Sequence, residues 1–73
     1  MNVLFVLNAW VSAMQIVPTS ITNAVVQIES HGQPNVVGRG CIGLMQICPQ
    51  WALVPKDMLF VPEVNKLEGN RML

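Results

Sequence analysis

The sequence predicts a small, mainly α domain made of short helices joined by loops. Pro18 and Pro62 each precede a segment with helical apolar spacing, and proline is favoured in the first turn of a helix. Between these two segments, residues 32–43 are rich in glycine and proline, which is typical of a loop. The chain has 73 residues, a length that fits one small domain.

The composition excludes some classes of protein. Apolar residues make up 52% of the chain and charged residues 11%, so the chain is unlike a disordered protein. Four basic side chains balance four acidic ones, and this excludes nucleic-acid binding through a basic surface. Because so short a chain buries only a small core, we expect apolar surface that meets a protein partner or a second copy.

The first part of the chain is apolar and uncharged from Val3 to Val17. This run is shorter than the ~20 residues that span a bilayer, and it lacks the basic start of a secretory signal. We therefore favour a retained helix over residues 1–15 that packs on a domain formed by residues 16–73. A cleaved signal and a membrane contact through residues 1–15 remain alternatives. The apolar positions of the predicted helix are Leu4, Leu7, Val11 and Met14.

The second helix is predicted to begin with Pro18 at its first position and to end before Gly32. Its apolar residues recur at helical spacing and predict the buried face: Ile21, Val25 and Ile28. Glu29 lies at the edge of this face and in the last turn of the helix. Burial and the helix dipole would both raise the pKa of Glu29, as a general acid requires.

Three further elements are expected after the loop. The apolar stretch from Gly43 to Ile47 is predicted to be extended. A third helix begins at Pro49, places Trp51 in the core and ends at Pro55. A fourth helix begins at Pro62 and buries one apolar face: Val64, Leu67 and Met72. Trp10 is likewise assigned to the core.

Cys41 and Cys48 are expected to be free thiols. Their separation corresponds to about 10 Å in a helix and about 23 Å in a strand, beyond the ~7 Å between Cα atoms that a disulfide allows. A bridge would require a turn between them. One histidine and two cysteines are too few for a closed structural zinc site, so no metal is predicted.

Four motifs in order resemble the soluble lytic transglycosylase domain of the lysozyme-like superfamily. They are the Glu29-Ser30 pair, the Pro34-Asn35 loop, the Gly43-Leu44-Met45-Gln46 signature, and the Pro62 to Asn65 helix start. The similarity covers residues 16–73. It implies a lysozyme-like fold, mainly α within an α+β superfamily.

The resemblance also implies an activity. The family cleaves the β-1,4 bond between N-acetylmuramic acid and N-acetylglucosamine in peptidoglycan, without a cofactor, and leaves 1,6-anhydromuramic ends. Glu29 would be the single general acid and base, and Ser30, Met45 and Gln46 would contact the glycan strand or position Glu29. The implied location is the cell envelope or periplasm, or a phage virion.

Purely structural roles for these residues remain alternatives to contact with the substrate. Ser30 has an alternative role at the helix end, and Met45 an alternative role in the core. Gln46, a polar amide in an apolar run, needs a hydrogen-bonding partner. His31 is expected to be exposed.

Two other functions remain as alternatives. One is a muramidase in which Asp57 serves as a second carboxylate. The other is a non-catalytic remnant or assembly subunit that packs on a partner chain. The chain has no tyrosine, although the family places one near the catalytic glutamate in a later part of the domain, so the match is expected to be truncated.

Overall fold

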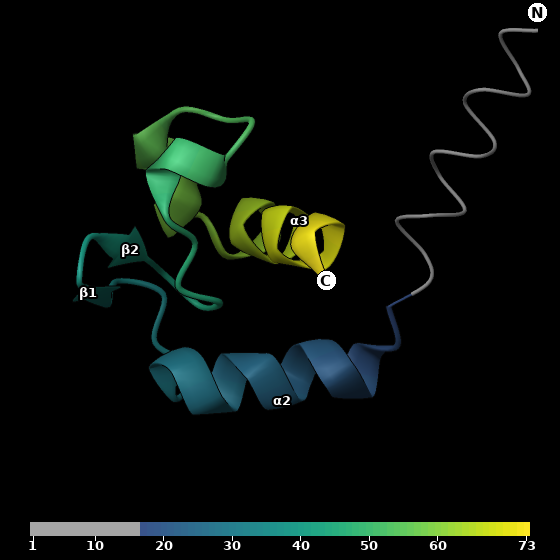
Figure 1. The fold of residues 1–73 in the computed structure, drawn as a ribbon. Coiled ribbons are helices and arrows are strands. Elements are labelled where there is room, and N and C mark those ends of the chain that lie inside the picture. Colours follow the sequence, from purple (N-terminus) through teal and green to yellow (C-terminus); the bar gives the residue numbers. More distant parts are fainter. Residues whose placement is uncertain (1–16) are drawn as a thin grey trace, which may run out of the picture.

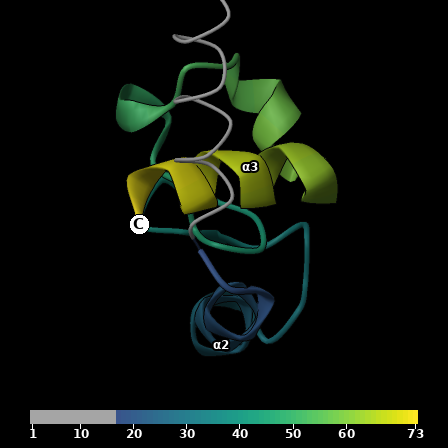
Figure 2. The ribbon, with the colours of Figure 1, turned by 90° about the vertical axis from the view of Figure 1, so that its right-hand side faces the viewer.

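The computed structural model describes residues 17–73. The helix predicted over residues 1–15, with Trp10, lies outside the described residues. The elements are α2 (Thr19–Ser30), β1 (Val37–Gly38), β2 (Cys41–Ile42), the 3₁₀ helices η1 (Pro49–Trp51) and η2 (Lys56–Phe60), and α3 (Pro62–Met72) (Figure 1). The view along α2 in Figure 2 shows α3 crossing over it. The mainly α fold is confirmed, with the addition of a two-stranded antiparallel hairpin.

The predicted helix starts lie close to the observed ones. Pro62 is the first residue of α3, as predicted, and Pro18 directly precedes α2, which begins at Thr19. At the other end of α2, the backbone turns left-handed at His31, with φ of 54°, and at Gly32, with φ of 79°. The 3₁₀ helix η1 begins at Pro49, and η2 was not predicted. Among residues 17–73, no helix combines the length and the apolar character that crossing a membrane requires.

The predicted buried face of α2 is wrong for two of its three residues, and only Val25 packs, partly buried, against the core. Ile28 is 77% exposed and Ile21 is also exposed. The side chains that the helix buries are Thr22, Val26 and Ser30. The two hydroxyl groups tolerate burial because each has a partner: Thr22 donates to Asn70 Oδ1 at 2.6 Å, and Ser30 donates to the Val26 carbonyl at 3.1 Å.

The predicted buried face of α3 is also wrong. Leu67 is 51% exposed and Met72 is exposed, whereas the helix buries Asn65, Glu68 and Gly69. Asn65 accepts a hydrogen bond from the Met45 amide at 2.8 Å. Its Nδ2 donates to the carbonyls of Ile42 at 2.7 Å and Leu59 at 2.8 Å. The helix therefore faces backbone groups that need hydrogen-bonding partners. This need, rather than the spacing of its apolar residues, decides which face of the helix is buried.

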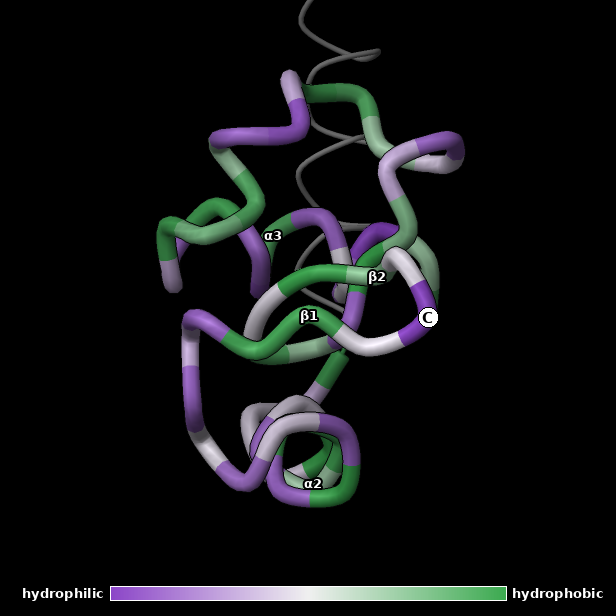
Figure 3. Tube along the Cα trace, turned by 90° about the vertical axis from the view of Figure 1, so that its left-hand side faces the viewer, coloured by the Kyte–Doolittle hydropathy of each residue, from purple (hydrophilic) through white to green (hydrophobic). Residues whose placement is uncertain are grey.

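Most of the core comes from the chain after the hairpin, with contributions from α2 and β2. The buried apolar residues of the core are Val26, Ile42, Leu44, Met45, Ile47 and Leu59. Figure 3 shows that the chain is hydrophobic at β1 and β2. Gly69 belongs to this packing, since a Cβ atom there would overlap the Met45 side chain. Trp51 was predicted to lie in the core but is 68% exposed.

Residues 43–46 form a turn rather than the predicted extended stretch. Ile42 and Ile47 pair across it as an antiparallel bridge, with both N–H···O distances at 2.9 Å. Gly43 and Gln46 have φ of 78° and 51°, a left-handed backbone that reverses the chain. The apolar run resembles a strand in pattern, but positive φ at both ends of the turn prevents it from continuing as one.

Cys41 and Cys48 form a disulfide, so the prediction of free thiols is wrong. The turn between Ile42 and Ile47 brings the two Cα atoms to 4.0 Å, although they are seven positions apart in the sequence. This is the turn that a bridge requires, and it was missed because residues 43–46 were predicted to be extended.

Removing the disulfide is expected to destabilise the domain. Closing so short a loop restricts the unfolded chain by about 2–3 kcal/mol, a large part of the stability of a small domain. The double variant Cys41→Ser with Cys48→Ser should therefore melt at a lower temperature than the oxidised wild type by circular dichroism. Reduced wild type should match the double variant. Equal melting of all three samples would contradict this role.

Glu68 connects α3 to the segment between η1 and η2. Its Oε1 accepts the Leu53 amide at 2.5 Å, and its Oε2 accepts Arg71 Nε at 3.3 Å. Arg71 also donates to the Trp51 carbonyl at 2.8 Å. Burial is the largest effect and raises the pKa of Glu68, but the Leu53 hydrogen bond and Arg71 together outweigh it, so the pKa is lowered.

A lowered pKa makes folding stability depend on pH in acid. Ionised Glu68 contributes stability above the unfolded pKa of about 4.3, and this contribution is lost as pH falls through the lower folded pKa. Glu68→Gln should therefore be less stable than wild type at pH 6, and the difference should shrink below about pH 4. Urea denaturation of both proteins at several pH values measures this difference in the free energy of unfolding. A difference that does not change with pH would contradict the prediction.

Candidate active site

Glu29 lies in the last turn of α2 and is exposed. The predicted burial of Glu29 is wrong because the helix turns Ile21 and Ile28 to the surface, and of the predicted stripe only Val25 packs, partly buried, against the core. The carboxyl instead opens onto two hollows in the surface. Without burial in the free protein, exclusion of water from this carboxyl would depend on a bound ligand.

The two hollows meet along Glu29 and Gln46, which line both. The first has a volume of about 400 Å³, and its other lining residues are Gly38, Arg39 and Cys41. The second has a volume of about 260 Å³ and is more apolar, with Val25, Met45, Ile47, Cys48 and Trp51 among its lining residues. The disulfide contributes one cysteine to each hollow. We refer to the two hollows together as the Glu29 groove.

Gln46 finds the partners that its position requires. Its Nε2 donates to the carbonyls of Val36 at 3.1 Å and Gly43 at 3.0 Å, so the amide joins the turn to the chain that leads into β1. Gly38 lies against the same side chain, since a Cβ atom at Gly38 would stand 2.8 Å from Gln46 Oε1. Gln46 is thus held in place beside Glu29 in the groove.

Ser30 and Met45 are placed differently from Gln46. Ser30 is 3% exposed, lines neither hollow, and accepts the Gly32 amide at 3.2 Å besides donating to Val26. These contacts match the helix-end role. Met45 is buried in the core and also borders the apolar hollow, which combines both interpretations considered for it.

The remaining candidates lie away from the groove. Asp57 is exposed on η2 and lines neither hollow, and His31 is exposed, as predicted. Sequence reasoning missed Arg39, although its position between two glycines was an available signal for a hairpin turn. Within residues 17–73, no group of three His, Cys, Asp or Glu residues is arranged to hold a metal ion.

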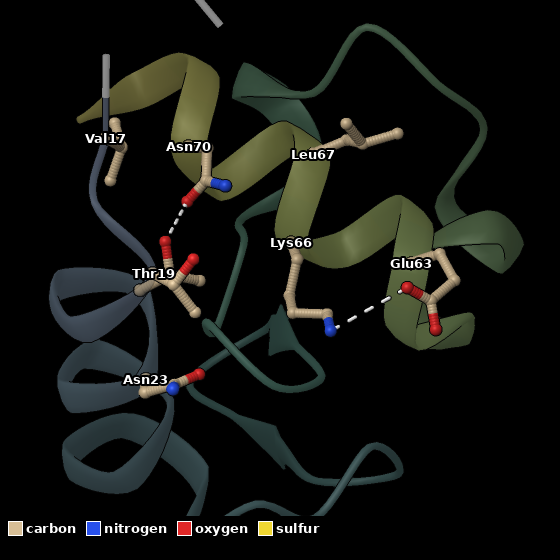
Figure 4. Close-up of a pocket in the computed structure, with 8 residues that line it drawn as sticks. Val17, Thr19, Asn23, Glu63, Lys66, Leu67 and Asn70 are labelled. Carbon is tan, nitrogen blue, oxygen red and sulfur yellow. Dashed lines mark hydrogen bonds and ion pairs between the residues drawn. The ribbon is translucent and has the colours of Figure 1, made fainter. Parts of the chain in front are cut away.

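A separate cavity of about 350 Å³ lies between α2 and α3. Figure 4 shows Asn70 and Lys66 of α3 pointing toward α2, where Thr19 and Asn23 lie, whereas Glu63 points toward Lys66. Lys66 and Glu63 pair at 3.7 Å on its rim. None of the predicted site residues lines this cavity, so it is distinct from the Glu29 groove.

The described residues form a mainly α, lysozyme-like fold with a carboxyl group at a helix end beside a Gly-Leu-Met-Gln turn. The family model of the transglycosylase SLT domain matches residues 7–70, and the chain therefore belongs to this family. No curated protein matches the chain, and no solved structure does.

Proposed function

We propose that the chain is a peptidoglycan lytic transglycosylase with Glu29 as its single general acid and base. The observation that carries the proposal is the position of Glu29, the one carboxyl among the described residues that line the groove. Family membership supports peptidoglycan as the substrate. Gln46 and Met45 border the groove beside Glu29 and are proposed to contact the glycan strand.

The proposed reaction needs one carboxyl and no water. Glu29 donates its proton to the glycosidic oxygen as the bond to C1 of N-acetylmuramic acid breaks. The resulting carboxylate then takes the proton from the 6-hydroxyl of the same sugar, whose oxygen bonds to C1. The product is a 1,6-anhydro ring, and Glu29 ends protonated as it began.

Digestion of purified sacculi followed by mass spectrometry of the products tests this proposal. Anhydromuramic ends support the lytic reaction. Reducing ends that carry the mass of one water would instead support a muramidase, which would need a second carboxylate or a positioned water. The exposed position of Asp57, outside both hollows, gives that alternative no support.

The disulfide supports a location outside the reducing cytosol. Structural disulfides persist in the periplasm, on cell surfaces and in virions. The bond between Cys41 and Cys48 is therefore compatible with the proposed cell envelope, periplasm or phage virion.

A non-catalytic role as an assembly subunit is the second candidate. It is favoured by the apolar side chains that remain exposed on both α-helices and on the segment between them: Ile21, Ile28, Trp51, Leu53, Leu67 and Met72. Exposed apolar surface of this kind commonly marks contact with another protein. A partner chain or a second copy of this chain would cover these residues.

The chain is expected to associate in solution. Sedimentation velocity at micromolar concentration should show a dimer or larger species, because burying the exposed apolar residues is favourable. Leu67→Lys should shift the distribution toward monomer, whereas Lys56→Ser, which changes an exposed polar position, should leave it unchanged. A monodisperse wild-type monomer with a cooperative melt would count against a required partner.

A further inference from the structure

The turn between β1 and β2 carries an unusual residue. Arg39 and Gly40 are the two loop residues, with φ of 54° and 80°. Two successive positive φ values indicate a type I′ turn, in which Asn, Asp and Gly are the favoured residues. Arginine has no conformational advantage at the first loop position. Because this unfavoured residue lies at the groove, we look for a functional reason for it.

Arg39 is also electrostatically available. The ion pairs among residues 17–73 join Lys66 to Glu63 and Arg71 to Glu68, and neither involves Arg39. Arg39 is exposed and lines the first hollow of the groove together with Glu29. A Cβ atom at Gly40 would meet no other atom within 4 Å, so the space beside the arginine is open.

We propose that Arg39 binds a carboxylate of the stem peptide carried by the N-acetylmuramic acid residue at Glu29. This inference rests on the proposed function and adds peptide recognition to it. The stem peptide is attached to the same sugar whose bond is cleaved, so it lies near Glu29 when that sugar is bound. A guanidinium group binds a carboxylate through two parallel hydrogen bonds, which gives both affinity and orientation.

The charge of the groove fits this assignment. Glu29 is the acidic group and Arg39 the basic group among the residues that line the first hollow. Unlike Glu63 with Lys66 and Glu68 with Arg71, these two groups do not form an ion pair with each other. An anionic peptide is therefore attracted to the hairpin side of the hollow, away from the carboxyl that must approach the glycosidic oxygen.

Binding measurements test the proposal without requiring turnover. Isothermal titration calorimetry would use the full chain with Glu29→Gln and two ligands. One is N-acetylglucosaminyl-N-acetylmuramic acid with a tetrapeptide, and the other is the same disaccharide without a peptide and with its lactyl carboxyl capped as the methylamide, so that it carries no carboxylate. Arg39→Asn should weaken binding of the peptide-bearing ligand about tenfold, as expected for one charge-assisted contact, and leave the peptide-free ligand unchanged.

The variants separate recognition from folding. Asn suits the left-handed turn, so Arg39→Asn should melt no lower than its parent. Arg39→Lys should retain part of the affinity as a point charge, and Lys56→Asn, at an exposed position outside the groove, should retain all of it. Amidation of the peptide carboxylates should reproduce the tenfold loss in the parent protein.

Several results would overturn the proposal. Arg39→Asn could lower the affinity for both ligands equally, or lower it for neither. The parent protein could bind the amidated peptide with full affinity, or show no measurable binding of the peptide-bearing ligand. The proposed function can fail separately, because it depends on anhydromuramic products from the wild-type chain. A selective loss in Arg39→Asn together with no such products would retain peptide binding and reject the lytic reaction.

Discussion

Glu29→Gln is expected to abolish the release of 1,6-anhydromuramic products from peptidoglycan. Glutamine preserves the size of the side chain but cannot give a proton to the glycosidic oxygen or take one from the 6-hydroxyl. Loss of a general acid and base typically lowers a rate by about 10²–10⁴-fold. Mass spectrometry of digested sacculi, with the amount of anhydromuropeptide followed over time, measures the effect.

Glu63→Gln provides the matched control for Glu29→Gln. Glu63 is exposed in the first turn of α3 and pairs only with Lys66, at 3.7 Å, among the described residues. Exposed pairs of this kind contribute little to stability, so the control should fold and act as wild type does. Retained activity in Glu29→Gln, or equal loss in both variants, would exclude Glu29 as the single acid and base.

Asn65→Ala is expected to unfold a large fraction of the chain. Asn65 is fully buried and makes three hydrogen bonds to the backbone at Met45, Ile42 and Leu59. Each buried group that loses its partner costs about 1–3 kcal/mol. Their sum is comparable with the ~3–5 kcal/mol that a core of this size supplies. Thermal circular dichroism and hydrogen exchange would measure the loss.

Two other substitutions show whether the effect comes from these hydrogen bonds. Asn65→Asp keeps an acceptor for the Met45 amide but places oxygen against the carbonyls of Ile42 and Leu59, so it should also destabilise strongly. Asn23→Ala removes an exposed amide from α2 and should change stability by less than about 0.5 kcal/mol. A stable Asn65→Ala variant would show that the turn holds without Asn65.

The position of the candidate site residues along the chain was more predictable than their surroundings. The position of Glu29 at a helix end, next to a glycine-rich loop and a Gly-Leu-Met-Gln segment, follows from residue order and local backbone preference. The resemblance to the family was confirmed by the match over residues 7–70. The exposure of Glu29 was not predictable, because it depended on which face of α2 meets the rest of the chain.

Apolar spacing failed for α3 because it assumes that a helix buries its most apolar face. This helix instead packs against backbone groups that need hydrogen-bonding partners. Asn65 and Glu68 satisfy such groups and are buried, while Leu67 remains exposed. In so small a domain, a few obligatory hydrogen bonds decide the orientation of a helix.

By itself, the sequence determined the approximate helix starts at Pro18 and Pro62 and the presence of a loop between them, because proline and glycine restrict the backbone locally. Tertiary structure alone decided the Cys41–Cys48 bond, the burial of Asn65, and the meeting of Arg39 with Glu29 and Gln46 in one groove. Each of these depends on the reversal of the chain between Ile42 and Ile47. That turn is held by Asn65, about 20 residues further along the chain, so no local pattern could specify it.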